Sequence, residues 1–491
     1  MITRLLMRNI NKISALLILI SVYFASCNKD NPGGIDPSSS DCPENVIKYR
    51  TMDLSVTTPH KAIGELVSNE YKNGWGRMEF AQPVTSIPAA AFYENTNLVS
   101  IELSNKVTSI GGDAFKGCSN LISATTGNGI TSIGERAFEG CSSLKEFAIA
   151  DGVSEIQYAT FTGCKALETV YVGQNVKVID DASFYNCANI TKVYTKNLKN
   201  WCEGGFMRAF SAYSYGKVDL YVDNKLLVDL VVPDGVSAIA DHSFVGLKRI
   251  KTVSLPETVN YILYYAFEDC EGLEKINFPA SLKGIGHHAF MGCTNLTRVD
   301  IASLEHWCSI AFYEDEDSYS YITNYPFQYS KEGHLFQSGK EITDIAIPAS
   351  CTVVGDYTFW KLKSIKSVKF HDSVTKIGLW AFMNCASLES LVIPDSVTLI
   401  DSGAFSYSGI ADVTLGKNMN RIGYEAFRGC ANLRKVTLTA NTPPVLYSRD
   451  NLNPFSECSS LESIIVPKGS LSVYQNTSGW SQYSALMKEA E

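Results

Sequence analysis

The sequence predicts an α/β solenoid, in which short strands form a parallel sheet, single helical turns connect them, and a cap closes each end. The dipeptide Ala-Phe, or a near variant, recurs about every 23 residues through most of the 491-residue chain. The residues around it repeat as Ile-Gly-x-x-Ala-Phe-x-Gly-Cys-x-x-Leu. The content of hydrophobic residues is 45% and that of charged residues is 19%, which is typical of a folded chain. A fixed period of this length indicates one elongated body of stacked units, none of which folds alone.

Thirteen phenylalanines mark the register of the repeat. They are Phe92, Phe115, Phe138, Phe161, Phe184, Phe244, Phe267, Phe290, Phe359, Phe382, Phe405, Phe427 and Phe455. The steps between them are 22 or 23 residues or three times 23, apart from a 60-residue step to Phe244 and a 28-residue step to Phe455. We refer to these residues as the register phenylalanines.

Each unit contains signals for a strand and for a turn. The leucine of the motif opens a short alternating run, such as Leu388 to Ile393, and this period predicts a strand with one buried face. Proline then ends the strand, as at Pro394, because it cannot donate to a ladder. A second apolar pair, Val397 and Ile400 in this unit, turns the chain back. Ala-Phe followed by glycine predicts one helical turn that the glycine closes.

Cysteine is tied to the same repeat. Nine of the 14 cysteines stand three residues after a register phenylalanine: Cys118, Cys141, Cys164, Cys187, Cys270, Cys293, Cys385, Cys430 and Cys458. Stacked positions lie within bridging distance, but equivalent side chains point the same way, and Leu247 and Leu362 take this place in other units. We therefore expect buried free thiols rather than disulfides. Zinc is disfavoured because the chain has no Cys-x-x-Cys pair.

The first residues have the layout of an export signal. Arg4, Arg8 and Lys12 precede an apolar run over 13–24, and two small residues then precede Cys27. Residues 1–26 are therefore expected to be a signal peptide. The segment also resembles a bacterial lipoprotein signal, which implies that Cys27 is lipidated and becomes the first mature residue. The alternative is ordinary cleavage, with Cys27 lost or left free. Residues 27–45 are rich in Pro, Gly, Ser and Asp and read as a flexible tether.

The repeat unit resembles the BspA-like class of leucine-rich repeats over residues 84–470. The resemblance implies a curved, right-handed leucine-rich-repeat solenoid with parallel strands on its concave face. It also implies an exported lipoprotein of the adhesion or host-interaction class, lipid-anchored at the outer membrane or cell surface. Residues 46–83 and 471–491 lack the repeat and are expected to form a β-rich N-terminal cap and a C-terminal cap, which cover the open ends of the core.

Two enlarged units, near 197–233 and 303–348, interrupt the rhythm, and both carry a Trp-Cys pair early in the unit. The second contains Tyr313, Tyr319 and Tyr321 on either side of four consecutive acidic residues. These tyrosines are candidate binding residues, because such a segment could hold a cation or a basic partner. The alternative is a solvated acidic loop above packed tyrosines. Calcium is disfavoured because no Asp-x-Asp-x-Asp-Gly loop is present.

The outward positions of the predicted strands contain a second candidate site. Tyr171 and Tyr194 occupy equivalent places in adjacent units and should stack about 5 Å apart. With Lys192 and Trp201 they form the candidate patch for contact with a protein or a glycan. The alternative is an aromatic pair that only stabilises the sheet.

Motifs of enzyme chemistry are missing from the sequence. None of the seven histidines lies in His-Glu-x-x-His, and neither a Gly-x-Ser-x-Gly elbow nor a phosphate-binding glycine loop occurs. The net charge is −9 without a run of Lys or Arg, which argues against nucleic acid as a partner. We therefore expect a protein without cofactor or catalytic site, which binds host or bacterial surface proteins. The alternatives are a glycan-binding lipoprotein and a structural scaffold of a surface assembly.

Overall fold

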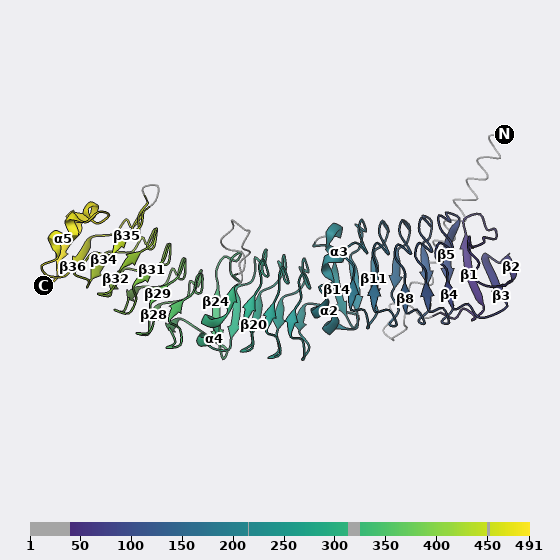
Figure 1. Cartoon of the computed structure of the whole chain (residues 1–491), viewed down its shortest axis with the longest axis horizontal. Coiled ribbons are helices and arrows are strands. Elements are labelled where there is room, and N and C mark those ends of the chain that lie inside the picture. Colours follow the sequence, from purple (N-terminus) through teal and green to yellow (C-terminus); the bar gives the residue numbers. More distant parts are fainter. Residues whose placement is uncertain (1–39, 215, 313–324, 449–451) are drawn as a thin grey trace, which may run out of the picture.

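The structure, a computed structural model, describes residues 40–214, 216–312, 325–448 and 452–491. These residues form a long, gently bowed solenoid that runs from the N-terminal strands at one end to helix α5 (Leu471–Asn476) at the other (Figure 1). Each regular coil consists of a longer strand, a two-residue strand and a turn segment that contains the register phenylalanine. The predicted parallel-strand solenoid is confirmed.

The longer strands make the main sheet, which lies in consecutive sections. They are β5 (Leu98–Glu102), β7 (Ser123–Thr125), β9 (Glu146–Ala148), β11 (Thr169–Val172), β13 (Lys192–Thr195), β14 (Asp219–Val222), β16 (Asp229–Val231), β18 (Thr252–Ser254), β20 (Lys275–Phe278), β22 (Arg298–Ile301), β24 (His334–Gln337), β26 (Asp344–Ala346), β28 (Ser367–Lys369), β30 (Ser390–Val392), β32 (Asp412–Leu415), β34 (Lys435–Leu438) and β36 (Ser463–Val466).

The two-residue strands form a second parallel ladder along the solenoid. They are β4 (Ser86–Ile87), β6 (Ser109–Ile110), β8 (Ser132–Ile133), β10 (Glu155–Ile156), β12 (Val178–Ile179), β17 (Ala238–Ile239), β19 (Tyr261–Ile262), β21 (Gly284–Ile285), β23 (Ala311–Phe312), β27 (Val353–Val354), β29 (Lys376–Ile377), β31 (Leu399–Ile400), β33 (Arg421–Ile422) and β35 (Val445–Leu446). In most of them the second residue is buried and the first is more exposed, so this ladder closes the core on another side.

The segment around the register phenylalanine differs from the expected helical turn. It is a series of tight turns, in which Lys116 N donates to Asp113 O at 3.1 Å and Cys118 N donates to Phe115 O at 3.1 Å. Asp113 has a φ of 55°, which breaks the run of right-handed residues that a helix needs. The amide of Phe115 instead donates to Ala137 O of the next coil at 2.7 Å. Hydrogen bonding between coils therefore replaces the helix. The closing Gly117 does take the positive φ, at 74°, for which glycine is suited.

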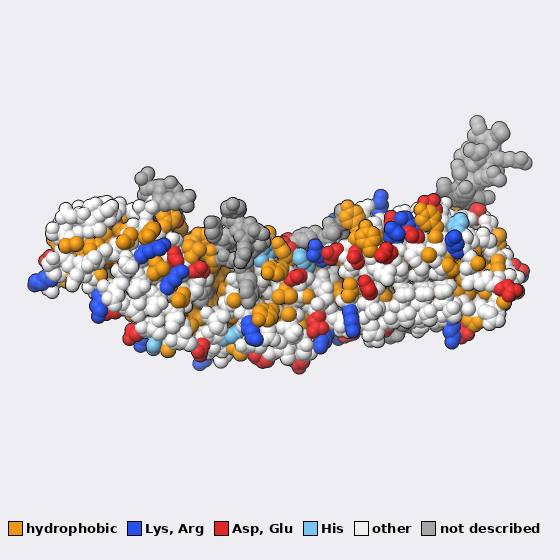
Figure 2. All heavy atoms as spheres, viewed as in Figure 1, with side chains coloured by type: hydrophobic (Ala, Val, Ile, Leu, Met, Phe, Trp, Pro, Cys, Tyr) orange, Lys and Arg blue, Asp and Glu red, His pale blue; other side chains and the backbone are white. Residues whose placement is uncertain are grey.

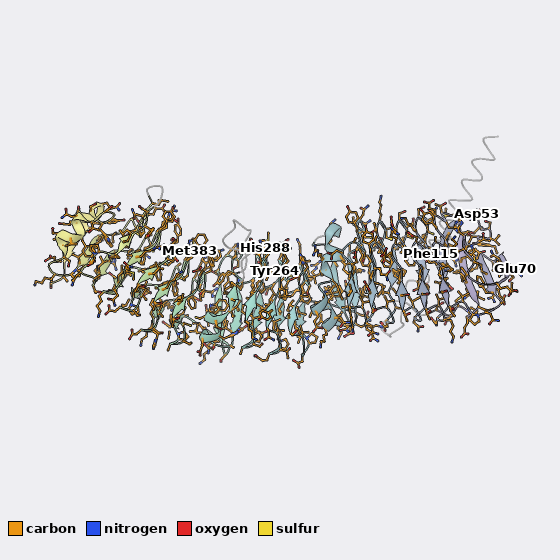
Figure 3. The ribbon with its side chains drawn as sticks, viewed as in Figure 1. Asp53, Glu70, Phe115, Tyr264, His288 and Met383 are labelled. Atoms are coloured by element: carbon orange, nitrogen blue, oxygen red, sulfur yellow. The ribbon has the colours of Figure 1, made fainter. Side chains whose placement is uncertain are left out.

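The register phenylalanines form the centre of the core. In the regular coils their rings stack on those of the next coil, with centroids 5.0–5.6 Å apart. Phe115, labelled in Figure 3, has no solvent exposure and lies between two such neighbours. Each stacked pair contributes about 0.5–1.5 kcal/mol beyond the area it buries. One continuous hydrophobic cluster therefore runs the length of the solenoid.

The cysteines of the repeat line this cluster as free thiols. Each donates from Sγ to the carbonyl oxygen of the register phenylalanine in the preceding coil, at 3.0–3.2 Å. All thirteen cysteines in the described part of the chain are free. Of the nine repeat cysteines, eight are buried, as predicted, and Cys458 is partly buried. Burial raises the pKa of the Cys118 thiol to about 12.

Strands at both ends depart from the repeat. At the N-terminal end β1 (Val46–Thr51), β2 (Leu66–Lys72) and β3 (Trp75–Phe80) are antiparallel, and β1 also pairs antiparallel with β5. At the C-terminal end α5, a 3₁₀ helix η1 (Ser481–Leu486) and β37 (Met487–Glu489) come after the last coil, and β37 pairs with β36. Tyr474 and Trp480 have no exposure and pack on the core here.

The expected tether boundary is wrong for residues 40–45. Asn105 Nδ2 donates to Ser40 O at 2.8 Å, and Val84 N donates to Glu44 O at 2.8 Å. Cys42 is only 6% exposed. This segment therefore packs on the first coils despite its polar composition, because it satisfies backbone groups there. The rest of the expected tether, and Cys27 with it, lie outside the described residues.

Candidate functional site

A row of three tyrosines stands on the solvent face of the main sheet. Tyr171 of β11 is in register with Tyr194 of β13, which is in register with Tyr221 of β14. The ring centroids are 4.8 and 4.5 Å apart, with interplanar angles of 20° and 19°. The valines next to Tyr171 and Tyr194 within their strands are buried, and successive side chains of a strand point to opposite faces, so the tyrosines point to solvent. The predicted stacking of the first two is confirmed, and we name the three the tyrosine ladder.

Tyr221 is a residue that the sequence reasoning missed. It comes after Tyr194 by 27 residues instead of 23, because it lies within the first enlarged unit. Only the alternating run Asp219 to Val222 could have signalled its orientation. The ladder ends with Tyr221, because β14 turns back into the antiparallel strand β15 (Lys225–Leu226) and no parallel strand comes next in that described section.

Lys192 lies beside the ladder and Trp201 does not. Lys192 is exposed on β13, and its register partners are Thr169 and Asp219. Trp201 belongs to helix α2 (Leu198–Gly204) and has no solvent exposure. Its indole Nε1 donates to Ser243 O at 2.9 Å. Trp201 as a binding residue is therefore a wrong prediction, since the ring fills the core of the enlarged unit.

The stacking decides which atoms the ladder offers to a ligand. Each ring covers a face of its neighbour, so the edges and hydroxyl groups point to solvent. The register partner of Tyr171 on its other side is the small Ala148. Burial and the nearby Tyr221 raise the pKa of Tyr194, so its hydroxyl stays protonated at neutral pH and can donate as well as accept.

The geometry of the repeated coil is that of a known family. A family model described as "BspA type Leucine rich repeat region (6 copies)" matches residues 77–209, 220–334 and 332–448. The chain belongs to the BspA-type leucine-rich-repeat family. The fold predicted from the resemblance is thus shown, together with the family itself.

Solved structures with similar coils come from several bacteria. A leucine-rich repeat protein from Bacteroides ovatus is 22% identical with a TM-score of 0.46, over 88% of this BspA-type chain and 100% of the other. One from Eubacterium ventriosum is 21% identical with a TM-score of 0.31, over 67% and 82%. A leucine rich cell surface protein from Faecalibacterium prausnitzii is 20% identical with a TM-score of 0.28, over 87% and 90%. Comparison with curated proteins found no match.

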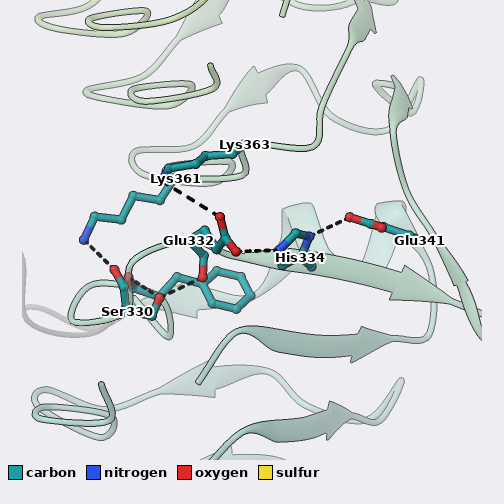
Figure 4. A network of polar contacts seen from close by, with 7 residues as sticks. Ser330, Glu332, His334, Glu341, Lys361 and Lys363 are labelled. Carbon is teal, nitrogen blue, oxygen red and sulfur yellow. Dashed lines mark hydrogen bonds and ion pairs between the residues drawn. The ribbon is translucent and has the colours of Figure 1, made fainter. Parts of the chain in front are cut away.

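The candidate binding residues of the second enlarged unit lie outside the described residues. Tyr313, Tyr319 and Tyr321 fall within 313–324, for which no structure is described. The residues that come directly after 324 are firmly attached to the solenoid of this BspA-type protein. Lys361 Nζ donates to Gln328 O at 2.5 Å. It also donates to Ser330 O at 3.2 Å (Figure 4).

A polar network on β24 continues from this point. His334 Nδ1 lies 2.6 Å from Glu341 Oε1, and its Nε2 lies 3.6 Å from Glu332 Oε1 (Figure 4). The contact with His334 lowers the pKa of Glu341. The guanidinium carbon of nearby Arg298 lies over the Phe336 ring, 3.7 Å from its centroid, and Arg298 pairs with Asp300 at 2.7 Å. The charged groups on this part of the sheet face thus neutralise one another.

Metal sites and membrane spans are both lacking in the described part of the chain. Within residues 40–491, apart from the undescribed segments, no group of three or more His, Cys, Asp or Glu side chains could hold a metal ion. In the same residues, none of the helices has the length and hydrophobicity of a membrane span. The tyrosine ladder therefore remains the best-formed candidate on the sheet face.

Proposed function

We propose that this BspA-type protein is a non-enzymatic surface protein whose sheet face binds a protein of the host or of another bacterium, with the tyrosine ladder at the centre of the contact. The tyrosine ladder is the observation that supports this proposal. It places three half-buried tyrosines in a row on a rigid sheet, and tyrosine is enriched where proteins bind each other. Ring stacking fixes the side chains before binding, so little conformational entropy is lost on contact.

The orientation of the rings favours a protein over a glycan. A sugar ring packs its C–H face on an open aromatic face, and stacking closes most of the faces here. The hydroxyl groups form a row with the spacing of the strands, which suits the carbonyl and amide groups of an extended segment. Glycan binding stays the second candidate, because Tyr171 is the end ring of the tyrosine row, next to the small Ala148.

The test compares the double variant Tyr171→Ala/Tyr194→Ala with Tyr158→Ala, which removes a tyrosine that is 53% exposed on a turn of a neighbouring coil. Each protein is applied to an array of purified host extracellular proteins and to a glycan array. The wild type and the control should bind the same protein target, and the double variant should bind it at least tenfold more weakly with an unchanged melting temperature. Unchanged binding by the double variant would remove the ladder as the site.

Results from the two arrays also separate the alternatives. Binding on the glycan array alone would replace the protein proposal with the glycan one. If both arrays are blank, the scaffold hypothesis gains, and a partner from the same cell surface becomes the expectation.

We also propose that the protein is exported and lipid-anchored through Cys27 at the outer membrane or cell surface. The proposal is supported by the signal-like layout of residues 1–26 and the position of the cysteine directly after it. Cells that express the full chain would be labelled with an alkyne fatty acid, and the label should appear on the wild type and be lost in Cys27→Ala. Equal labelling of both would refute the anchor.

A further inference from the structure

One position of the coil holds an aliphatic residue or methionine in eleven coils and a cysteine in one. The position lies eight residues before the register phenylalanine, in the turn between the main-sheet strand and the two-residue strand. The eleven residues are at most 3% exposed: Val84, Val107, Ile130, Val153, Val176, Val236, Val259, Leu282, Val374, Val397 and Met419. In the coil of Phe359 the residue is Cys351, which is only partly buried. The coil itself therefore does not require this cysteine.

The backbone of this turn is the same with either side chain. Cys351 N donates to Pro348 O at 3.0 Å, as Val397 N donates to Pro394 O at 3.1 Å. The side chain of Cys351 packs against the hydrophobic core, to which Val397 belongs. The thiol of Cys351 thus takes the place of an aliphatic side chain at the edge of the core.

A second cysteine lies against this turn. Cys308 belongs to helix α4 (Leu304–Ser309) of the second enlarged unit and is also partly buried. Glu305, which precedes Cys308 by one helical turn, accepts at Oε1 from Ser350 Oγ at 2.7 Å. Residues three apart on a helix lie on one face, so Cys308 lies on the side of α4 that meets Ser350 and its neighbour Cys351.

The two thiols interact with each other. Burial raises the pKa of Cys308, and the thiol of Cys351 raises this pKa further, through its charge and a hydrogen bond between the side chains. A second contact fixes α4 beside the pair, because Trp307 Nε1 donates to Thr358 O of the same coil at 2.8 Å. The contacts of Glu305 and Trp307 therefore hold the two thiols together without a covalent bond.

The first enlarged unit attaches its helix without a second cysteine. Cys202 of α2 is the counterpart of Cys308, and Val236, which has no exposure, takes the place of Cys351. The tryptophan bond to the next coil is made there too, by Trp201. A cysteine pair is thus not needed to attach the helix, and its presence in the second unit points to thiol chemistry.

We infer that Cys308 and Cys351 are a redox-active pair, which a small disulfide oxidises to one disulfide bond, and that this bond braces the joint between two sections of the main sheet. It joins α4 to the coil of β26, the first strand after an interruption of that sheet. The inference is independent of the sheet-face contact. Only the formation of the bond in the living cell rests on the proposed export, because disulfides form and persist outside the cytoplasm.

The reaction is thiol–disulfide exchange in two steps. The thiolate of one cysteine attacks a sulfur of the small disulfide, which forms a mixed disulfide and releases one small thiolate. The thiolate of the other cysteine attacks the protein sulfur of the mixed disulfide and releases the second small thiolate. The two cysteine protons pass to the two leaving thiolates. The cysteine pair loses two electrons, and the small disulfide gains them.

Both steps need access for the reagent. Cys308 and Cys351 are partly exposed, whereas eight of the nine repeat cysteines are buried. In Figure 2 basic, acidic and histidine side chains are interspersed on the lower edge of the molecule, around the place where Figure 1 labels α4. On this visible part of the surface, no field of a single sign repels an anionic disulfide such as oxidised glutathione.

The experiment compares the reduced and the oxidised form of the purified full chain. The chain is reduced with a phosphine and then incubated with oxidised glutathione at about pH 8.5, because the raised pKa of Cys308 slows the reaction at neutral pH. The remaining thiols are alkylated in denaturant, and the digest is analysed by mass spectrometry without reductant. A cross-linked Cys308–Cys351 peptide should appear in most molecules, and Cys202, the matched cysteine without a partner, should be alkylated. Alkylation of both cysteines of the pair, or their recovery only as mixed disulfides with glutathione, would overturn the inference.

Hydrogen exchange measures the bracing effect. Amides of β26 at 344–346 should exchange about threefold or more slowly in the oxidised form, because the bond restrains local opening of the joint. Amides of β16 at 229–231, which follow the first enlarged unit, should exchange equally in both forms. The control variant Cys351→Val copies Val236 and should show the same exchange with and without oxidant. Unchanged exchange of β26 in the cross-linked wild type, or an equal change in the control variant, would refute the bracing role. Either failure leaves the sheet-face proposal intact.

Discussion

At the scale of single residues, the repeated cysteine is explained by one hydrogen bond. The thiol of Cys141 reaches back to Phe115 O at 3.1 Å, and the same contact recurs in the other cysteine coils. Sulfur fills a small apolar space and still satisfies a buried carbonyl group. Ser408 takes the place in one coil and contacts Cys430 Sγ at 3.3 Å, so a hydroxyl group is also accommodated.

The buried thiols predict a loss of stability at alkaline pH. Burial raises the pKa of Cys118 and Cys458 to about 12 and that of Cys430 to about 11, whereas an unfolded thiol ionises near pH 9. A raised folded pKa contributes stability that is complete below the unfolded pKa and is lost as the pH rises towards the folded one. The melting temperature, followed by circular dichroism, should therefore fall between about pH 9 and about pH 11.

The control for this prediction is Cys118→Ser/Cys141→Ser, in which neither replaced group can ionise. Its melting temperature should fall less than that of the wild type over the same pH interval. An identical fall in both proteins would assign the alkaline loss to other groups.

At the scale of elements, sequence reasoning found the strands and missed the form of the turn. Alternation in runs such as Leu388 to Ile393 marks a strand, because burial on one face decides both pattern and structure. The form of the turn could not be predicted, because the amide of Phe115 donates to a carbonyl group of the next coil, and no local sequence signal shows this. Trp201 was misplaced for a similar reason: its partner Ser243 is 42 residues away. The pairing of Tyr171 and Tyr194 was foreseen because the repeat itself sets their register.

Glycines of one motif should differ in their tolerance of alanine. A Cβ on Gly134 would lie 2.5 Å from the backbone nitrogen of Gly112, whereas a Cβ on Gly140 would meet nothing closer than 3.7 Å but has a φ of 72°. Gly140→Ala should cost about 1 kcal/mol of unfolding free energy through backbone strain. Gly134→Ala should cost about 2 kcal/mol or more, because two backbones must separate. Urea denaturation measures both, and the reverse order would show that the coils are not in close contact at Gly134.

The two enlarged units share a buried hydrogen bond from a tryptophan. Trp307 Nε1 donates to Thr358 O at 2.8 Å, as Trp201 Nε1 donates to Ser243 O, and in both cases the acceptor directly precedes a register phenylalanine. Trp307→Phe removes the shorter of two side-chain hydrogen bonds to that buried carbonyl, the other coming from Tyr325 Oη at 3.5 Å. The variant should cost about 1 kcal/mol in urea denaturation, in addition to the loss of packing.

The matched control is Trp360→Phe. Trp360 is also buried, at 6% exposure, but its Nε1 has no hydrogen-bond partner among the described residues. The Trp360→Phe variant should therefore lose less unfolding free energy than Trp307→Phe. Equal losses would show that packing, and not the hydrogen bond, decides the role of Trp307.

At the scale of the whole molecule, the enlarged units divide the main sheet. Hairpins β14–β15 and β24–β25 (Lys340–Glu341) each end a section, and the next section starts at β16 or β26. Helix α2 and helix α4 (Leu304–Ser309) precede these divisions, and α3 (Met207–Ser214) lies in the first enlarged unit. Trp201 of α2 and Trp307 of α4 each donate a hydrogen bond to a residue of the coil after the division. The hydrophobic core therefore continues across both places where the sheet is interrupted.

Hydrogen exchange should reveal these divisions. Strands β16 and β26 pair on one side only, whereas β20 and β32 pair on both. Amides of the first two should exchange faster in native conditions, because one flank of the ladder is open there. Mass spectrometry of peptides over 229–231, 344–346, 275–278 and 412–415 measures the difference. Equal protection at all four would mean that the sheet behaves as one cooperative unit.

The near-constant 5.0–5.6 Å interval between register phenylalanines has a consequence for how such a chain can change over generations. An in-frame duplication or deletion of one 23-residue coil keeps every contact type and alters only the length of the rod. The length of the solenoid can thus change by one coil at a time, while the segments that close its two ends stay the same.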